Sequence, residues 1–215
     1  MARPRLHDPD EVLDTTEQLI ARSGPAAVTI RAIAGATGMS NGALYHSFGS
    51  RSGLVGQTWI RAARRFLEVQ AELVDAGLSA GGGSQPAARA VVGAADAPAV
   101  FAERFPASSV ILHALRRSDL LGDGLPEDIS EEISRLERQL IGLMIRLSVA
   151  MWDRKDAAAV DVITTCVVDL PTSILLTRDR LGKPTAREHL RAAVRAILSV
   201  GPPPVESVPR IQEMS

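Results

Sequence analysis

Four side chains able to hydrogen-bond to a polyanion lie close together between residues 40 and 46. Ser40 carries a hydroxyl, Asn41 an amide, Tyr45 a phenol and His46 an imidazole. An Asn amide can pair with the edge of adenine, and hydroxyl, phenol and imidazole groups can reach phosphate or sugar oxygens. The chemistry that this segment suggests is contact with DNA.

Small residues and helix starts favour the same interpretation. Gly42 and Ala43 would let the backbone approach a groove closely, and the Ala43 methyl group could touch a thymine methyl group. Thr29 and Ser40 are good helix caps, where hydroxyls and free backbone N–H groups can bind phosphate oxygens. Residues 40–47 contain no Lys or Arg, so bidentate recognition of guanine is not available from this segment.

Two short helices must position these groups. The segments TIRAIAGA and SNGALYH begin at Thr29 and Ser40, and Gly38 between them can take a positive φ without steric cost. The side chains expected to face inward and close a small core are Ile30, Ile33, Ala34, Met39 and Leu44. A first helix, a tight turn and a slim second helix make up a helix-turn-helix, which places its second helix in the major groove of DNA.

The run VTIRAIAGATGMSNGALYHSFGSRSGLV resembles the signature region of the TetR family of repressors. The positions that carry the resemblance are Thr29, Ile33, Ala34, Gly38, Met39, Ser40, Ala43, Leu44, Tyr45, Phe48, Ser50 and Leu54. It implies DNA contact from Thr29, Arg31, Ser40, Asn41, Tyr45, His46 and Arg51. Arg51 replaces the usual Lys and keeps a cation at the groove edge. Ser52 and Gly53 replace the usual acidic residues, and Asn41 leaves the operator sequence open.

Charge is distributed unevenly along the 215 residues, whose formal net charge is -1. Residues 1–65 hold eight arginines against five acidic residues, a balance of +3, so the remainder carries -4. A basic amino-terminal piece on an acidic body suggests that only one end meets a polyanion. Arg3 and Arg5 are either a frayed tail or an arm that reaches the minor groove.

Composition also indicates where the protein resides. The single cysteine, Cys166, excludes an intrachain disulfide and a cysteine-based zinc site. We see no run of about 18 apolar residues and no signal peptide in MARPRLHDPDEV, so we expect a soluble, cytoplasmic protein without a membrane partner. Cys166 lies in an apolar run, which favours an inert hydrophobe over a redox sensor.

Caps and apolar spacing predict an all-α chain of about nine helices. A first helix should begin after Asp8 and end near Ser23, and a long one should run from Ser50 to about Asp75. Further helices are expected at 86–103, 107–118, 127–153, 156–180 with a kink at Pro171, and 185–199, after a glycine-rich break at 78–88. The predicted domains are a helix-turn-helix domain at 1–50, a connecting helix at 51–77, a helical ligand-binding and dimerisation domain at 78–200, and a disordered tail at 201–215.

One recognition helix reads only a few base pairs, so a homodimer on a palindromic operator is expected. The last two helices are the predicted interface, through Val160, Ile163, Val167, Ile174, Leu190, Val194 and Ile197. By resemblance, helices 86 to 180 would enclose a small-molecule ligand that releases the protein from DNA. The expected lining is Phe101, Phe105, His113, Met144, Met151, Trp152, Cys166 and Asp169. Because aromatics make up 3% of the chain, an aliphatic or acyl ligand is favoured, or none.

Other interpretations stay open at this point. The segment 29–48 could be an ordinary helical hairpin, Tyr45 could pack beside Leu44, His46 could be a solvated surface residue, and His113 and Asp169 could be buried polar residues. A helical assembly protein that has lost DNA binding is a second function class. An enzyme is a third, but no GxSxG, HExxH, phosphate loop or paired-carboxylate spacing appears. We therefore expect no enzymatic activity, metal or cofactor.

Overall fold

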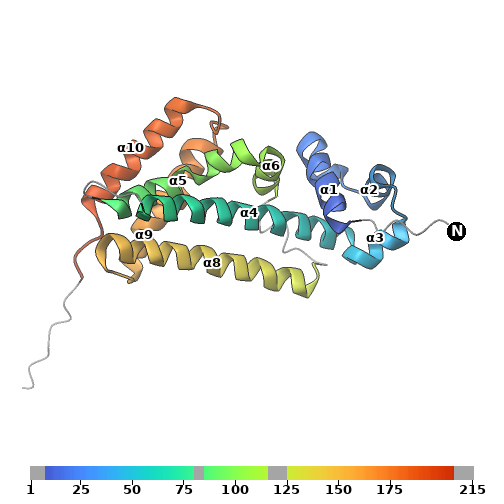
Figure 1. Cartoon of the computed structure of the whole chain (residues 1–215), viewed down its shortest axis with the longest axis horizontal. Coiled ribbons are helices and arrows are strands. Elements are labelled where there is room, and N and C mark those ends of the chain that lie inside the picture. Colours follow the sequence, from blue (N-terminus) through green and yellow to red (C-terminus); the bar gives the residue numbers. More distant parts are fainter. Residues whose placement is uncertain (1–7, 80–84, 116–124, 206–215) are drawn as a thin grey trace, which may run out of the picture.

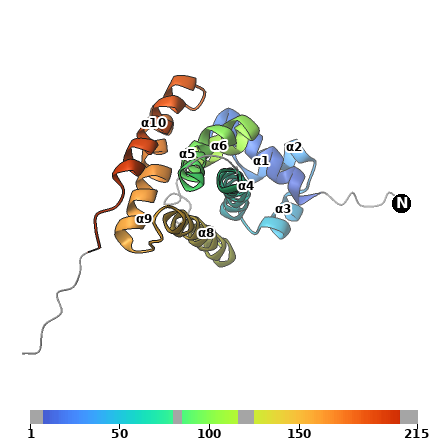
Figure 2. The same ribbon diagram turned by 60° about the vertical axis from the view of Figure 1, so that its left-hand side comes forward.

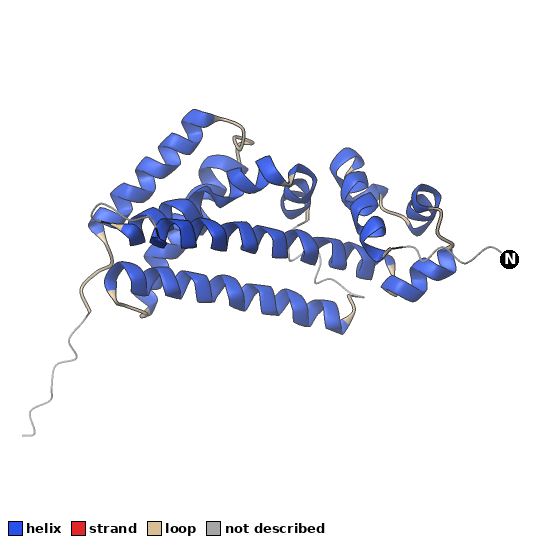
Figure 3. Ribbon diagram, viewed as in Figure 1, coloured by secondary structure: helices blue, strands red, loops and turns tan. Residues whose placement is uncertain are grey.

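The computed structural model describes residues 8–79, 85–115 and 125–205, and within these residues it contains nine α-helices and no strand. Figure 1 shows an elongated molecule with the amino-terminal helices at one end, and Figure 3 shows the same view by secondary structure. The helices are α1 (Pro9–Ser23), α2 (Ile30–Thr37), α3 (Asn41–Phe48), α4 (Arg51–Ser79), α5 (Pro86–Arg104), α6 (Pro106–Ala114), α8 (Glu127–Trp152), α9 (Ala157–Thr164) and α10 (Pro184–Val200). The expectation of an all-α fold is confirmed.

We call residues 8–50 the head and residues 85–205 the body. The long helix α4 joins them, and it packs against α1 and α3 at one end and α5 and α8 farther along (Figure 1). Figure 2 shows α9 and α10 together on the flank of the body that lies away from the head.

Local hydrogen bonds explain where the first and fourth helices begin. The Asp8 carboxylate accepts from the Asp10 N–H at 3.0 Å, and the Ser50 hydroxyl accepts from the Gly53 N–H at 2.9 Å. Both caps were expected from the sequence. Helix α4 continues past Asp75 to Ser79, and α6 ends at Ala114, whereas residues 116–118 of the expected helix lie outside the described residues.

The helix after α9 departs from α geometry where the sequence predicted a kink. Two π-helical turns, η2 (Thr165–Asp169) and η3 (Thr172–Leu176), flank Leu170 and Pro171. A proline cannot donate the i→i−4 hydrogen bond, and wider π turns accommodate the interrupted ladder. The disturbance at Pro171 therefore takes the form of π turns.

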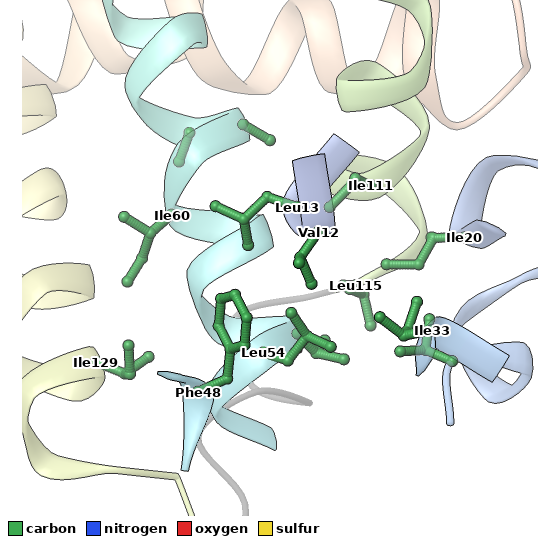
Figure 4. Close-up of a cluster of buried hydrophobic side chains, with 14 of the residues drawn as sticks. Val12, Leu13, Ile20, Ile33, Phe48, Leu54, Ile60, Ile111, Leu115 and Ile129 are labelled. Atoms are coloured by element: carbon green, nitrogen blue, oxygen red, sulfur yellow. The ribbon is translucent and has the colours of Figure 1, made fainter. Parts of the chain in front are cut away.

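Two hydrophobic clusters hold the molecule together. The first joins the head to α4, α6 and the first half of α8, and Figure 4 shows Val12, Ile20, Ile33 and Ile111 among its side chains. The second lies between the end of α4, α5, the second half of α8, α9 with its π turns, and α10. The head is therefore not a separate module, because its core continues into α6 and α8.

Helices α4 and α5 approach each other very closely. A Cβ atom on Gly77 of α4 would lie 2.5 Å from the backbone N and Cα of Ala90 on α5, and one on Gly93 would lie 3.0 Å from the Leu73 carbonyl oxygen. Real Cβ atoms do not make contacts as short as the first. The alanines of α5 at this interface, Ala90 and Ala94, are fully buried. Small residues thus bring two backbones together and leave little room between them.

A buried carboxylate fastens α10 to α5. Asp96 is 6% exposed, and its two oxygens accept from Arg187 at 2.9 and 2.6 Å and from Arg191 at 2.5 Å. Burial raises the pKa of Asp96, but the hydrogen bonds from the two arginines outweigh burial, so its pKa lies below the ordinary value. Arg187 also pairs with the exposed Glu103.

The segment Ala157–Leu176 is long and apolar enough to cross a membrane, contrary to our expectation that no such stretch occurs. Its Ile163, Cys166 and Leu175 side chains belong to the second hydrophobic cluster, whereas Asp161 and Asp169 on it are exposed. A helix that packs into the core of a protein can be as long and as apolar as a membrane-spanning helix. One side of this segment therefore packs into the core of the body, and the other side is exposed.

Candidate DNA-binding surface

The recognition helix α3 is anchored by two large apolar side chains. Leu44 is fully buried and Phe48 is 3% exposed, so the opposite side of this helix faces solvent. The Ser40 hydroxyl caps the helix by accepting from the Ala43 N–H at 3.1 Å. Tyr45, on the outward side, is 54% exposed and does not pack beside Leu44.

The residues expected to touch DNA share this exposure with one exception. The exposed residues are Ser40, just before α3, Asn41, Gly42, Tyr45 and His46 on α3, Thr29 and Arg31 at the start of α2, and Arg51 at the start of α4. The exception is Ala43, which is half-buried and packs against the first hydrophobic cluster. The prediction that its methyl group faces outward is wrong, because Ala43 lies beside Leu44 on the inward side of α3.

The helix before α3 is built as the sequence predicted. The Thr29 hydroxyl accepts from the Ala32 N–H at 3.1 Å, and Ile33 is fully buried. Gly38 ends the helix with φ 73°, a left-handed conformation, and Met39 beneath α3 is 8% exposed. Two helices joined by a tight left-handed turn, with the second presenting an exposed polar side, have the geometry of a helix-turn-helix.

Arg51 has a structural role that the sequence did not reveal. Its Nε atom donates to the Val28 carbonyl oxygen, and its Nη2 atom donates to the Pro25 carbonyl oxygen at 2.7 Å. These carbonyls belong to η1 (Pro25–Ala27) and the residue after it, between α1 and α2. Arg51 therefore fixes the start of α4 to the base of the helix-turn-helix, and its contact with DNA remains a prediction.

Three arginines of α4 in the basic amino-terminal region are already paired. Arg61 and Arg65 form ion pairs with Glu17, and Arg64 pairs with Glu132 of α8 at 2.6 Å. These partners neutralise the charge of the three arginines, so Arg22, Arg31, Arg51 and His46 supply the basic groups of the described head.

The family model for "Bacterial regulatory proteins, tetR family" matches residues 12–58, which run from α1 into the first half of α4. The chain therefore has the amino-terminal region of the TetR family. It is a DNA-binding transcriptional regulator and not an enzyme, as expected from the signature region. No curated protein sequence matches the chain.

Solved structures of the TetR fold align with this regulator over nearly its whole length. PfmR of Thermus thermophilus, a TetR-family transcriptional regulator, is 19% identical with a TM-score of 0.53, and 88% of this chain and 98% of PfmR are covered. FadR of Bacillus halodurans, a fatty acid degradation regulator, is 13% identical with a TM-score of 0.62, and 92% and 96% are covered. FadR of Bacillus subtilis, solved with stearoyl-CoA, is 12% identical with a TM-score of 0.61, and 89% and 98% are covered. At these identities the likeness shows the fold of both head and body.

The eight residues predicted to line a ligand pocket lie partly in the core of the body and partly on its surface. Phe101 is 2% exposed and makes ring contacts with Phe66 and Phe105, at centroid distances of 5.5 and 5.6 Å. Met144 and Cys166 lie in the second hydrophobic cluster, and Met151 and Trp152 are half-buried against it. His113 and Asp169 are exposed on the surface, so neither is the buried polar residue that we considered.

An open groove between α4 and α8 is lined by other residues. Its apolar walls are Leu67, Ala71, Leu136 and Leu143, and its rim carries Arg64, Glu68, Glu132 and Gln139. None of the eight predicted pocket residues lines it. The groove and the predicted pocket residues are therefore different parts of the molecule, and the ligand pocket remains a prediction.

Cys166 is fully buried, as its apolar surroundings suggested. Burial raises the pKa of its thiol to about 11, so very little thiolate is present at neutral pH. Thiolate is the reactive form, and a redox sensor needs it to be accessible. The side chain therefore acts as a small hydrophobe in the core of the body.

Most of the side chains predicted to form the dimer interface point into the protomer instead. Ile163, Val167, Leu190 and Val194 are at most 4% exposed and belong to the second cluster. Val160, Ile174 and Ile197 are half-buried against that cluster. The apolar stripes of α9 and α10 hold these helices to their own body. The four residues that are at most 4% exposed therefore cannot also contact a partner.

Replacing Gly42 by alanine should weaken DNA binding about tenfold without destabilising the fold. A Cβ atom there would meet nothing nearer than the Ser40 hydroxyl, at 4.0 Å, so packing within the head does not require glycine. Alanine favours a helix by roughly 0.5–1 kcal/mol over glycine, and the cost of keeping Gly42 is consistent with close approach to a groove.

The matched control is Gly142→Ala on α8, where an added Cβ atom also meets nothing within 4 Å. Both variants should melt at or above the wild-type temperature, and only Gly42→Ala should lose affinity in a fluorescence anisotropy titration with operator DNA. Equal affinity of the two variants would mean that Gly42 does not lie against DNA.

Proposed function

We propose that this chain is a repressor that binds a palindromic operator as a homodimer and is released by a small-molecule ligand. The observation that carries this proposal is the exposed polar side of α3, where Asn41, Tyr45 and His46 stand opposite the buried Leu44 and Phe48. A slim helix with such a side fits the major groove. Because it spans only a few base pairs, two copies are needed for specific binding.

The proposed dimer uses the exposed sides of α9 and α10, not the residues first predicted. Ala192 and Ala196 lie one turn apart on the outward side of α10, and Ala158 is exposed on α9. Small side chains allow helices of two protomers to approach closely and form a four-helix interface. The exposed alanines of α10, and the flank that α10 shares with α9 (Figure 2), support this choice.

Introducing an arginine on the exposed side of α10, and separately on that of α8, tests where the interface lies. Ala196→Arg should convert the dimer to a monomer in analytical ultracentrifugation, because a cation would be buried against its own symmetry mate. The control is Ile145→Arg on α8, where Ile145 is 37% exposed beside Ile141 and Val149. A dimer that survives Ala196→Arg but is lost with Ile145→Arg would place the interface on α8.

The proposed operator is found by selecting bound duplexes from a random pool with the purified full-length protein. We expect an inverted repeat, and the logarithm of the affinity should fall linearly with the logarithm of salt concentration, because phosphate contacts release counterions. Binding that shows no sequence preference, or no salt dependence, would contradict a repressor and favour the helical assembly protein.

For the ligand we propose an aliphatic or acyl compound. Aromatics make up 3% of the chain, and the FadR of Bacillus subtilis with this fold was solved with stearoyl-CoA. The test adds stearoyl-CoA, and free CoA as control, to the protein bound to its selected operator. Release by stearoyl-CoA alone supports an acyl ligand, and release by neither compound contradicts it. The division into domains at residues 50, 77 and 200, and a cytoplasmic location, belong to the same proposal.

A further inference from the structure

Glu17 is a buried carboxylate at the junction of three helices. It belongs to α1 of the head, its side chain is 6% exposed, and it forms ion pairs with two arginines of α4. Arg61 lies at 3.0 Å from one oxygen, and the Arg65 Nη1 atom donates to both oxygens at 3.2 Å. Burying a carboxylate removes its hydration, and the charge-assisted hydrogen bonds from the two arginines compensate for that loss.

The third helix of the junction is α6 of the body. The Ser108 hydroxyl, which is 1% exposed, donates to Glu17 at 3.1 Å and accepts from Arg65 at 3.1 Å. The Arg65 guanidinium also stacks over the Phe105 ring, 5.5 Å from its centroid, just before α6 begins. Four residues, namely Glu17, Arg61, Arg65 and Ser108, thus form what we call the Glu17 junction.

The far end of α6 is fastened as well. The Trp59 Nε1 atom on α4 donates to the Leu115 carbonyl oxygen at 3.2 Å, at the carboxyl end of α6. With both ends of α6 bonded to α4, Ser108 offers Glu17 a fixed partner. The head therefore meets the body through a polar contact whose geometry is set by α4 and α6 together.

We propose that Glu17 is a positioning residue that fixes the angle of the head on the body and thereby determines which operator spacing the dimer accepts. The proposal rests on the dimer and palindrome proposed above. Inserting one base pair between half-sites moves them apart by about 3.4 Å and rotates them by about 35°. A head that is held at one angle cannot follow that change, whereas a loosened head can.

The experiment compares affinities of the full-length protein for the selected palindrome and for the same duplex with one base pair inserted at its centre. The wild type should lose about thirtyfold on insertion, and Glu17→Gln and Ser108→Ala should lose less than about threefold. Ser108→Ala removes only the hydrogen bonds of Ser108 with Glu17 and Arg65, and it leaves both arginine pairs of Glu17 in place. This variant therefore tests the junction even if Glu17→Gln fails to fold.

Glu132→Gln is the matched control. Glu132 is 14% exposed and also pairs with two arginines, Arg64 and Arg135, but these ion pairs lie on α4 and α8 and include no residue of the head. It should keep the wild-type spacing preference. A purely structural role of Glu17 would lower affinity for both duplexes equally, and that result would overturn the proposal.

The two proposals fail in distinguishable ways. If the wild type itself binds both duplexes equally, the fixed spacing of a dimer on a palindrome is wrong, and the role of Glu17 in it falls as well. If the wild type prefers the selected spacing and Ser108→Ala prefers it to the same degree, the dimer stands and the positioning role of the Glu17 junction is refuted.

Discussion

Replacing Tyr45 by alanine weakens operator binding by about ten- to a hundredfold, the range expected when a phosphate or base contact is lost. Tyr45 is a large hydrophobic side chain of the head that is 54% exposed, and no hydrogen bond within the described residues uses its hydroxyl. Its ring and hydroxyl are therefore available to DNA. Because Leu44 and Phe48 anchor α3 from the other side, the truncation should leave the melting temperature within about 2 °C of the wild type.

Tyr45→Phe separates the two parts of this side chain. It removes the hydroxyl and keeps the ring, so a loss equal to that of Tyr45→Ala would assign the contact to the hydroxyl. Fluorescence anisotropy with operator duplex measures both variants, and sedimentation checks that each remains a dimer. Wild-type affinity in Tyr45→Ala would refute the proposed docking of α3.

Replacing Asp96 by asparagine is expected to destabilise the body by about 3 kcal/mol at pH 7, because it leaves two arginines near a buried neutral side chain. Arg187 and Arg191 keep some access to water, with side chains 18% and 38% exposed, so we expect the lower end of the range for broken buried pairs. Urea unfolding followed by circular dichroism measures the change.

The same variant should show a defined pH dependence. The pKa of Asp96 is lowered in the folded protein, so its ionic contribution to stability is complete above the unfolded pKa, near 3.8, and is lost as pH falls through the folded value. The stability gap between wild type and Asp96→Asn should therefore shrink below about pH 4. The control Glu103→Gln removes an Arg187 partner that is 62% exposed and should cost less than about 0.5 kcal/mol. A gap that persists unchanged to pH 2 would show that Asp96 acts without its charge.

The head could be predicted from the sequence because local signals specify it. Ser40 and Thr29 cap their helices through residues three positions away, and Gly38 takes its positive φ within the turn itself. Each of these features depends on neighbours along the chain. The error at Ala43 arose where a helix of eight residues had to be divided between an inward and an outward side.

The body was less predictable because its features depend on distant partners. Periodicity correctly marked Leu190 and Val194 as buried, but it does not say whether a side chain is covered by its own protomer or by another. The shape of any pocket likewise depends on distant partners. The sequence does not show that Gly77 and Ala90 bring α4 and α5 into backbone contact.

One signal of the Glu17 junction was present in the sequence and was missed. Glu17 lies on the side of α1 that carries Leu13 and Ile20, four and three residues away, which is an unusual place for a charge. An acidic residue on an apolar helix side needs a buried cationic partner. Arg61 and Arg65, one turn apart on the next long helix, were the available partners, whereas nothing in the sequence pointed to Ser108.

The tight seam of small residues between α4 and α5 bears on how fast this regulator can respond. A compound that must lodge between these two helices finds no space there at rest and has to wait for thermal separation of the backbones. Its observed association rate would then level off at high concentration, at the opening rate of the seam. The small residues that bring α4 and α5 together would then limit the rate at which such a compound releases the protein from DNA.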